Sequence, residues 1–249
     1  SIQFSAFAKV NSSKCEPVVM DEQFNSAVTD IFRNEYLSPR SPYTTLQIPK
    51  QGIGEWCHPL HTVDIDDSGL RSSVQKGVLN TKLGVPFRTP AEGQNIAFTS
   101  LWDNYPDSLT VSLKGKASRA YLLMAGSTNH MQCHIDNGLI RVYYKDGTCD
   151  KMALRNPDNW APIEHIFFED GLAFNRHAPA LYRLRLKTGE ISNNFGEELG
   201  FPGASRELDG GAAILLEMPL NPDKKLSHLV LETLSNDVVI GLMGITLQR

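Results

Sequence analysis

The sequence predicts an all-β protein built as an antiparallel β-sandwich, preceded by a short N-terminal extension that contains one helix. Strand-like segments of about 5–8 residues recur at spacings of about 8–15 residues from residue 44 onward. Turns that contain glycine separate several of these segments. Helical periodicity is clear in one segment, before residue 44. We therefore divide the chain into an extension, residues 1–43, and a sandwich domain, residues 44–249.

Size and composition place the chain among ordinary globular proteins. It has 249 residues, of which 41% are hydrophobic, and a formal net charge of −4. These values exclude a disordered or collagen-like chain. A mildly acidic protein has no general positive field for phosphate backbones, which disfavours nucleic acid as a partner. No apolar run approaches the roughly 18 residues of a membrane span, and the N-terminal sequence lacks a signal-peptide pattern.

The one helix is expected at residues 21–34. Apolar side chains recur there at i, i+4, i+7 and i+8, which places them on one face of a helix, and Asp21 is a suitable N-cap. These apolar residues are Phe24, Val28, Ile31 and Phe32. Pro39 and Pro42 then indicate a loop. The N-terminal extension is compatible with a linker, an interdomain contact or a part of the sheet.

The strand candidates differ in how they are covered. Residues 109–113 alternate between polar and apolar side chains, as a half-buried strand does. Residues 120–125 are continuously apolar, as in a central strand that is covered on both faces. Other strands are expected at residues 96–101, 131–135, 140–144, 151–154, 181–186, 212–216, 227–234 and 238–247. Residues 163–179 and 190–211 have no strand pattern and are expected to be long loops.

Two glycine turns define the expected register of a meander. Asn137-Gly138 and Asp146-Gly147 are expected to connect three successive strands as two-residue hairpin turns. This register places Cys133 and Cys149 on the two outer strands, about 10 Å apart. A disulfide needs Cα atoms within about 7 Å of each other. We therefore expect that these two cysteines are not bridged.

Several phrases of the sequence, taken together in their order, resemble a known family. They are residues 84–90 (GVPFRTP), 95–107 (NIAFTSLWDNYPD), 120–132 (AYLLMAGSTNHMQ), 156–160 (NPDNW) and 239–247 (VIGLMGITL). From about residue 53 to its end, the chain resembles the C-terminal β-sandwich region of multidomain, α-rhamnosidase-like glycoside hydrolases of gut Bacteroidetes. It is more distantly similar to carbohydrate-binding modules with a galactose-binding-like jelly roll. The resemblance implies a jelly-roll fold, a parent protein exported to the periplasm or cell surface, and catalytic carboxylates in another domain.

Residues 102–105 are the first candidate for binding sugar. Trp102 offers an aromatic plate for the apolar face of a sugar ring, and Asp103, Asn104 and Tyr105 offer groups for its hydroxyls. The segment follows a predicted strand, so it is expected on a loop at one end of the sandwich. The alternative is a buried Trp102 under a proline-anchored turn, with the polar side chains bound to their own backbone.

Two further places carry side chains that suit a glycan. Asn129, His130 and Gln132 follow the most apolar strand and could bind neighbouring hydroxyls, or they could form an ordinary exposed strand face. Trp160 lies in a loop that two prolines fix. An exposed ring there would form a sugar platform, whereas a buried one would seal the end of the sandwich.

Three acidic residues are the candidate for a metal site. Asp64, Asp66 and Asp67 offer the oxygen ligands that calcium prefers. Their spacing lacks the rest of an EF-hand loop and also fits an ordinary turn that needs no ion. Calcium is the only cofactor that the sequence suggests. The patterns of a nucleotide-binding loop and of a serine hydrolase are absent.

We expect a noncatalytic accessory domain of a polysaccharide-degrading glycoside hydrolase, which binds carbohydrate or packs on the catalytic domain of a larger polypeptide. One alternative is that the chain is itself a glycoside hydrolase or lyase that uses acidic residues in the sandwich cleft. Such hydrolysis usually needs two carboxylates, about 5–5.5 Å apart for retention or about 6.5–9.5 Å apart for inversion. The other alternative is a purely structural module, whose isolated surface would expose a large apolar patch.

Overall fold

The computed structural model describes residues 10–34, 37, 64–128, 133–164, 166, 180–195, 207–236 and 238–249. Its helical turns are η1 (Ser12–Lys14), η2 (Asp21–Gln23), η3 (Val28–Asp30) and α1 (Ser68–Ser72). Its strands are β1 (Cys15–Pro17), β2 (Val74–Gln75), β3 (Val78–Asn80), β4 (Pro86–Arg88), β5 (Ala97–Ser100), β6 (Ser108–Ser112), β7 (Arg119–Thr128), β8 (Asp136–Tyr144), β9 (Cys149–Arg155), β10 (Tyr182–Arg185), β11 (Ile191–Ser192), β12 (Ala212–Pro219), β13 (Leu226–Thr233) and β14 (Val238–Gln248).

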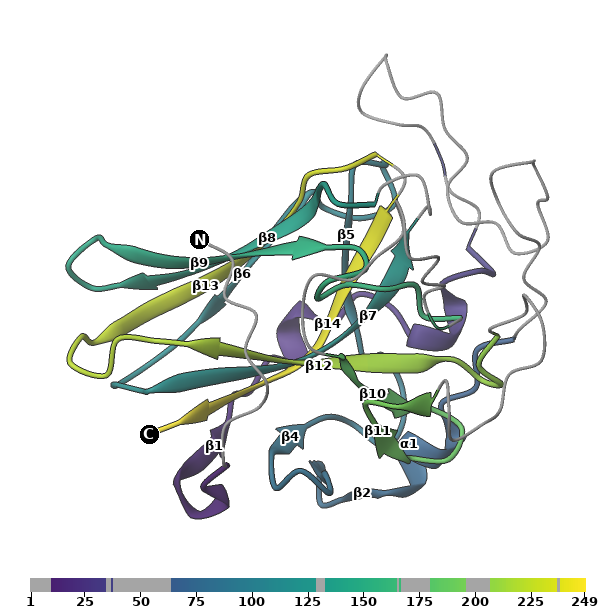
Figure 1. Cartoon of the computed structure of the whole chain (residues 1–249), viewed down its shortest axis with the longest axis horizontal. Helices are drawn as coiled ribbons and strands as arrows, with labels where there is room; N and C mark the ends of the chain where they lie inside the picture. The colour runs from purple at the N-terminus through teal and green to yellow at the C-terminus, as the bar shows by residue number, and fades with distance from the viewer. Residues whose placement is uncertain are drawn as a thin grey trace.

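Two antiparallel sheets pack face to face as a β-sandwich (Figure 1). The larger sheet has the strand order β1-β14-β7-β12-β10-β11, with β5 paired to β14, and the smaller sheet has the order β6-β13-β8-β9. A three-stranded sheet, β2-β3-β4, lies against the other face of the larger sheet. The predicted all-β, antiparallel sandwich is confirmed for the described part of the chain.

A hydrophobic core lies between the two main sheets. β7 contributes Leu122 and Met124 from the larger sheet, and β8 contributes Ile140 and Val142 from the smaller one. Trp160 fills the same core with no exposed surface. The alternate residues of β8 are partly exposed, because successive side chains of a strand point to opposite faces.

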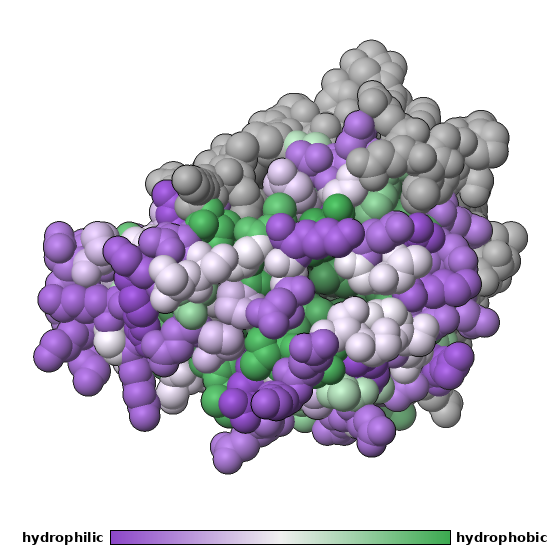
Figure 2. Space-filling model, turned by 90° about the horizontal axis from the view of Figure 1, so that it is seen from below, coloured by the Kyte–Doolittle hydropathy of each residue, from purple (hydrophilic) through white to green (hydrophobic). Residues whose placement is uncertain are grey.

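The other face of the larger sheet is buried as well. Tyr121, Leu123 and Ala125 of β7 belong to a second core, which Leu70 of α1 and Phe87 of β4 help to close. β7 is therefore buried on both faces, which confirms the prediction drawn from its continuous apolar sequence. Figure 2 views the molecule from below and shows mostly hydrophilic residues, with apolar ones visible between them near the centre.

Most of the other predicted strands are present. β5, β6, β9, β10, β12, β13 and β14 overlap the segments expected from periodicity. The strand expected at residues 131–135 is not found in its described part, residues 133–135. Residues 163–179 lie mostly outside the described residues, and residues 190–211 lie half outside them. β11 is the one strand described within these two segments.

The N-terminal extension differs from the expected helix. Residues 21–34 form two separate turns, η2 and η3, so the prediction of one continuous helix is wrong. Asn25 and Ser26 instead pair with Ile96, whose carbonyl accepts from both backbone N–H groups at 3.0 and 3.2 Å. The apolar positions still face inward, since Val28 is fully buried. β1 pairs with β14, so this part of the extension belongs to the larger sheet.

The meander has a different register from the predicted one. Gly138 lies inside β8 and is paired on both sides, by β13 and by β9, so the prediction of a turn at Asn137-Gly138 is wrong. A Cβ on Gly138 would lie 2.5 Å from Cδ1 of Ile240. This glycine therefore allows close packing between the sheets. The turn at Asp146-Gly147 is confirmed, with Gly147 at a φ of +87°.

The cysteine prediction depended on that register. Cys149 pairs with Tyr143 at the start of β9, and Cys133 lies before β8, where it forms an isolated bridge with Asn156. Within the described residues the two cysteines are not joined in a disulfide. The strands place them differently from the predicted meander, because β8 continues through the expected turn.

Candidate functional site

A polar cleft lies where four separate segments of the chain meet. Its volume is about 650 Å³, within the range of small-molecule sites, roughly 300–1,000 Å³. The segments are residues 25–34, α1, the loop before β5 and the turn after β5. Eight of the ten described lining residues have polar side chains. They include Asp30, Asn34, Arg71, Gln94, Asn104 and Tyr105.

Asn25 fixes the first wall of the cleft to β5. Its Nδ2 donates to the carbonyl of Phe98 at 3.0 Å, and its Oδ1 accepts from the N–H of Phe98 at 2.8 Å. β5 pairs with β14 on one side, so the amide side chain satisfies backbone groups on its other edge. The turn η3 follows directly and carries Asp30 to the cleft.

Asp67 joins three of the walls. Its Oδ2 accepts hydrogen bonds from Arg71 Nε at 2.9 Å and from Asn95 Nδ2 at 3.0 Å. The Oδ1 of Asn95 accepts from the N–H of Val28 at 2.9 Å. Arg71 also donates from Nη2 to the carbonyl of Gly93 at 2.6 Å. The Asp67 carboxylate therefore connects α1, the loop before β5 and the N-terminal segment.

A glycine stands where α1 approaches another turn. A Cβ on Gly69 would lie 2.2 Å from the carbonyl oxygen of Lys187, so a larger residue would push the two backbones apart. The N–H of Leu70 donates to the carbonyl of Leu186 at 2.8 Å. These two contacts fix α1 against the end of β10 and thereby position Arg71 at the cleft.

The turn after β5 supplies the last wall. Trp102 is 8% exposed, and its Nε1 donates to the carbonyl of Asn236 at 3.2 Å. Tyr105 is 7% exposed, and its ring packs against Phe98 with centroids 5.2 Å apart. Its hydroxyl accepts a hydrogen bond from Asn34 Nδ2. Burial raises the pKa of Tyr105 above its ordinary value, so this hydroxyl stays protonated at neutral pH.

The four predicted sugar-binding residues of this turn are placed differently. Asn104 and Tyr105 line the cleft, and Oδ1 of Asn104 accepts from the N–H of Leu37 at 2.7 Å. Asp103 is exposed and is not among the described lining residues. Trp102 is buried in the second core, so its ring is not available as an open platform. Its expected role as an aromatic plate is therefore corrected, and the alternative of a buried Trp102 describes the structure.

Trp160 is also placed inside the protein. Its side chain lies in the core between the sheets, next to Gly126, where a Cβ would lie 2.6 Å from Cζ2 of the indole. A sugar platform must present one ring face to the ligand, so the expected platform at Trp160 is corrected to a core residue. Asn129, His130 and Gln132 lie outside the described residues.

The acidic side chains of residues 64, 66 and 67 do not form a cluster. Asp64 is exposed, Asp66 accepts from the N–H of Ser68 at 2.9 Å, and Asp67 is engaged by two side-chain donors. Within the described residues, no three His, Cys, Asp or Glu side chains lie close enough to hold a metal. The positions of these side chains give no support to the expected calcium site, and the Asp67 carboxylate binds cationic and amide groups of the protein.

Asp30 is the one carboxylate among the described lining residues. Among these residues of known position, none donates a hydrogen bond to this carboxylate or forms an ion pair with it. The lining cation, Arg71, is already paired with Asp67 at 2.9 Å. Gln94 is exposed beside the cleft, and no described residue bonds its amide. The cleft therefore offers a charged acceptor and an amide that no described side chain uses.

Several of the cleft residues were not predicted from the sequence. These are Asn25, Asp30, Asn34, Arg71 and Gln94. They are single polar residues on segments that are distant in sequence, so no local spacing marks them. Residues 25–34 were assigned to a helix because their apolar positions have helical spacing, and this assignment concealed their polar edge.

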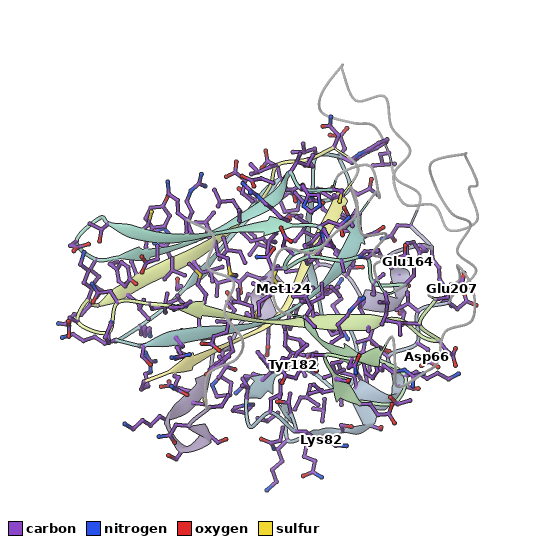
Figure 3. All side chains as sticks on the ribbon, in the orientation of Figure 1. Asp66, Lys82, Met124, Glu164, Tyr182 and Glu207 are labelled. Atoms are coloured by element: carbon purple, nitrogen blue, oxygen red, sulfur yellow. The ribbon has the colours of Figure 1, made fainter. Side chains whose placement is uncertain are left out.

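A second charged cluster lies away from the cleft. Glu164 and Arg183 are both buried, and Nη2 of Arg183 donates to the carbonyls of Pro162 and Ala212 at 2.8 and 2.9 Å. Burial raises the pKa of Glu164 to about 7, and the charge of Glu207 acts in the same direction. Figure 3 shows Glu164 and Glu207 at the same end of the molecule. Neither carboxylate lines the cleft.

The fold and the cleft define the class of this protein as an antiparallel β-sandwich with a polar cleft beside β5. No known family, curated protein or solved structure matches the chain. No helix in the described ranges is long and apolar enough to cross a membrane. Because one fold can serve many functions, a function has to be argued from the chemistry of the cleft.

Proposed function

We propose that this protein is a noncatalytic carbohydrate-binding domain and that the polar cleft is its saccharide site. A saccharide presents many hydroxyl groups, each of which both donates and accepts hydrogen bonds. Carboxylate, amide and guanidinium groups complement such a ligand, and these groups dominate the described lining. The observation that carries the proposal is Asp30, which lines a small-molecule-sized cleft and whose carboxylate has no partner among the described residues.

The proposal extends to the setting that the sequence resemblance implies. In that setting the sandwich is a jelly roll of the galactose-binding-like kind. The domain serves a larger, exported glycoside hydrolase and is joined to its catalytic domain. The order of the sequence phrases supports this part of the proposal, and the polar cleft supports the carbohydrate ligand.

The two alternatives have less support. Hydrolysis of a glycosidic bond usually uses a pair of carboxylates, and Asp30 is the one carboxylate that lines the described cleft. A purely structural module would bury a large apolar face against its neighbour. Within the described residues, the exposed large apolar side chains are Val19, Leu37, Ile135 and Leu234. A large interdomain contact is not indicated by these four residues.

The test is a glycan-array screen of the whole chain, followed by a product assay on each glycan that binds. A Gln94→Arg variant places a long side chain at the cleft, and Ala91→Arg is its matched control. Ala91 is exposed in the same loop but does not line the cleft, and both variants add one positive charge.

We expect binding without turnover, a loss of about tenfold or more in affinity for Q94R, and wild-type affinity for A91R. Turnover of a bound glycan would make the protein an enzyme. Equal affinity of Q94R and A91R for the glycan would show that the saccharide site lies outside the cleft. If the wild-type protein bound no glycan on the array, this result would contradict the carbohydrate-binding function.

A further inference from the structure

The charges around the cleft are unbalanced. Arg71 is the one cationic side chain among the described lining residues, and its Nε lies 2.9 Å from Oδ2 of Asp67. This pair is about neutral as a unit, since each charge compensates the other. Asp30 adds a second carboxylate without a cation among the described residues beside it. The described part of the lining is therefore negative, and the whole chain has the same sign, with a formal net charge of −4.

The cleft also lacks an open aromatic surface in its described part. The Tyr105 residue is 7% exposed and its ring packs on Phe98, and Trp102 is 8% exposed and belongs to the second core. A ligand cannot stack on either ring as a sugar stacks on an exposed platform. The described lining can therefore recognise a sugar only through hydrogen bonds to its hydroxyl groups.

From these two observations, and resting on the proposed function, we infer the class of sugar that the cleft accepts. We propose that it binds neutral saccharides, with the Asp30 carboxylate accepting hydrogen bonds from neighbouring hydroxyl groups, and that it excludes uronic acids and sulfated sugars. A hydroxyl bound to a carboxylate forms a charge-assisted hydrogen bond, which is stronger than a neutral one. A sugar carboxylate or sulfate would instead meet a like charge in a partly desolvated site, which is unfavourable.

The test uses an array that carries neutral oligosaccharides beside uronic-acid and sulfated ones of similar length. Asp30→Asn removes the charge and keeps the shape of the side chain. Asp21→Asn, at an exposed carboxylate of the preceding turn η2, is the matched control for the change in net charge. Since no described residue bonds the Asp30 carboxylate, D30N should fold with an unchanged thermal midpoint.

We expect neutral oligosaccharides to bind the wild-type protein, with affinity that is insensitive to salt because no ligand charge is screened. D30N should lower that affinity about 10- to 100-fold, and D21N should leave it unchanged. Asp30→Lys should weaken neutral binding further and gain affinity for uronic acids.

The outcomes separate this inference from the proposed function. Preferential binding of uronic or sulfated sugars that is strengthened in D30N would overturn the neutral class but keep the cleft as a glycan site. Wild-type affinity of D30N for neutral sugars would overturn the role of Asp30. Absence of binding to every neutral and acidic glycan would overturn the carbohydrate-binding function itself.

Discussion

Replacing Asp67 by alanine should destabilise the protein far more than an exposed carboxylate would. The Asp67 side chain is 10% exposed, and its Oδ2 accepts from Arg71 Nε at 2.9 Å and from Asn95 Nδ2 at 3.0 Å. Removing one partner of a well-buried ion pair costs about 3–5 kcal/mol. Arg71 keeps 17% of its side chain exposed, so water can compensate in part. We expect about 3 kcal/mol for D67A, near the lower end of that range.

The isosteric variant Asp67→Asn gives a second magnitude. Its amide oxygen can accept from the same two donors, but the negative charge is lost, and charge-assisted hydrogen bonds are about twice as strong as neutral ones. We expect D67N to cost about half as much as D67A, roughly 1–2 kcal/mol. In a domain of this size 1 kcal/mol corresponds to about 2–4 °C in Tm. D67A should therefore melt about 6–12 °C lower than the wild type, and D67N about 2–8 °C lower.

The assay is urea denaturation together with differential scanning calorimetry, with Asp64→Ala as the control. Asp64 is an exposed neighbour, so D64A should change stability by no more than about 0.5 kcal/mol. A double-mutant cycle with Arg71→Met should show a coupling energy of at least about 1 kcal/mol. A cost below about 1 kcal/mol for D67A, or zero coupling to Arg71, would refute the reasoning. If these residues formed a calcium site instead, D64A and D67A would lower the free energy of unfolding by similar amounts in calcium-containing buffer. The two variants would also have similar stabilities to each other in EDTA.

Three further predictions concern the core and its buried charge. Gly126→Ala should cost at least about 1–3 kcal/mol, because its Cβ would lie 2.1 Å from the carbonyl oxygen of Val239; an unchanged urea midpoint would contradict the tight packing. Trp160→Ala should cost about 3–5 kcal/mol in the same measurement, whereas an exposed platform would leave the midpoint nearly unchanged. Glu164 has a pKa of about 7 in the folded protein, compared with an ordinary 4.5. Between pH 4.5 and pH 7 its carboxyl group is therefore protonated in the folded state and ionised in the unfolded state. Its contribution to stability is full below about pH 4.5 and falls by about 3 kcal/mol as the pH rises through 7. Glu164→Gln should lack that fall, and parallel pH profiles of the two proteins would show that the carboxyl titrates normally.

Local sequence patterns were sufficient for the strands whose environment is regular. The uninterrupted apolar run of β7 predicts burial on both faces, because each of its two alternating faces meets a core. Alternation at residues 109–113 predicts β6, and Asp146-Gly147 predicts the turn before β9, since glycine readily takes the positive φ of +87° found there. In these places local preference and packing favour the same structure.

The same kinds of pattern give wrong predictions where tertiary packing overrides the local preference of a residue. Gly138 has a turn-like sequence context, yet it lies inside β8, where the absence of a side chain leaves room for Ile240 of the facing sheet. Three of the four apolar positions of residues 21–34 are buried and Phe32 is partly buried, but Asn25 and Ser26 bind β5 and the residue before it and interrupt the helix. Trp160 follows a polar loop sequence and fills the core.

By itself, the sequence determined the all-β class, most of the strands and the acidic balance of the chain, because these depend on composition and on periodicity over a few residues. Only the tertiary structure decided the cleft. The bond from Asn95 to Asp67 spans 28 residues, and the bond from Asn34 to Tyr105 spans 71. Contacts of this length depend on how the sheets pack and on which edge of β5 is left open. For the same reason Asp67 became an internal ion-pair partner and Asp30 the carboxylate that faces the cleft.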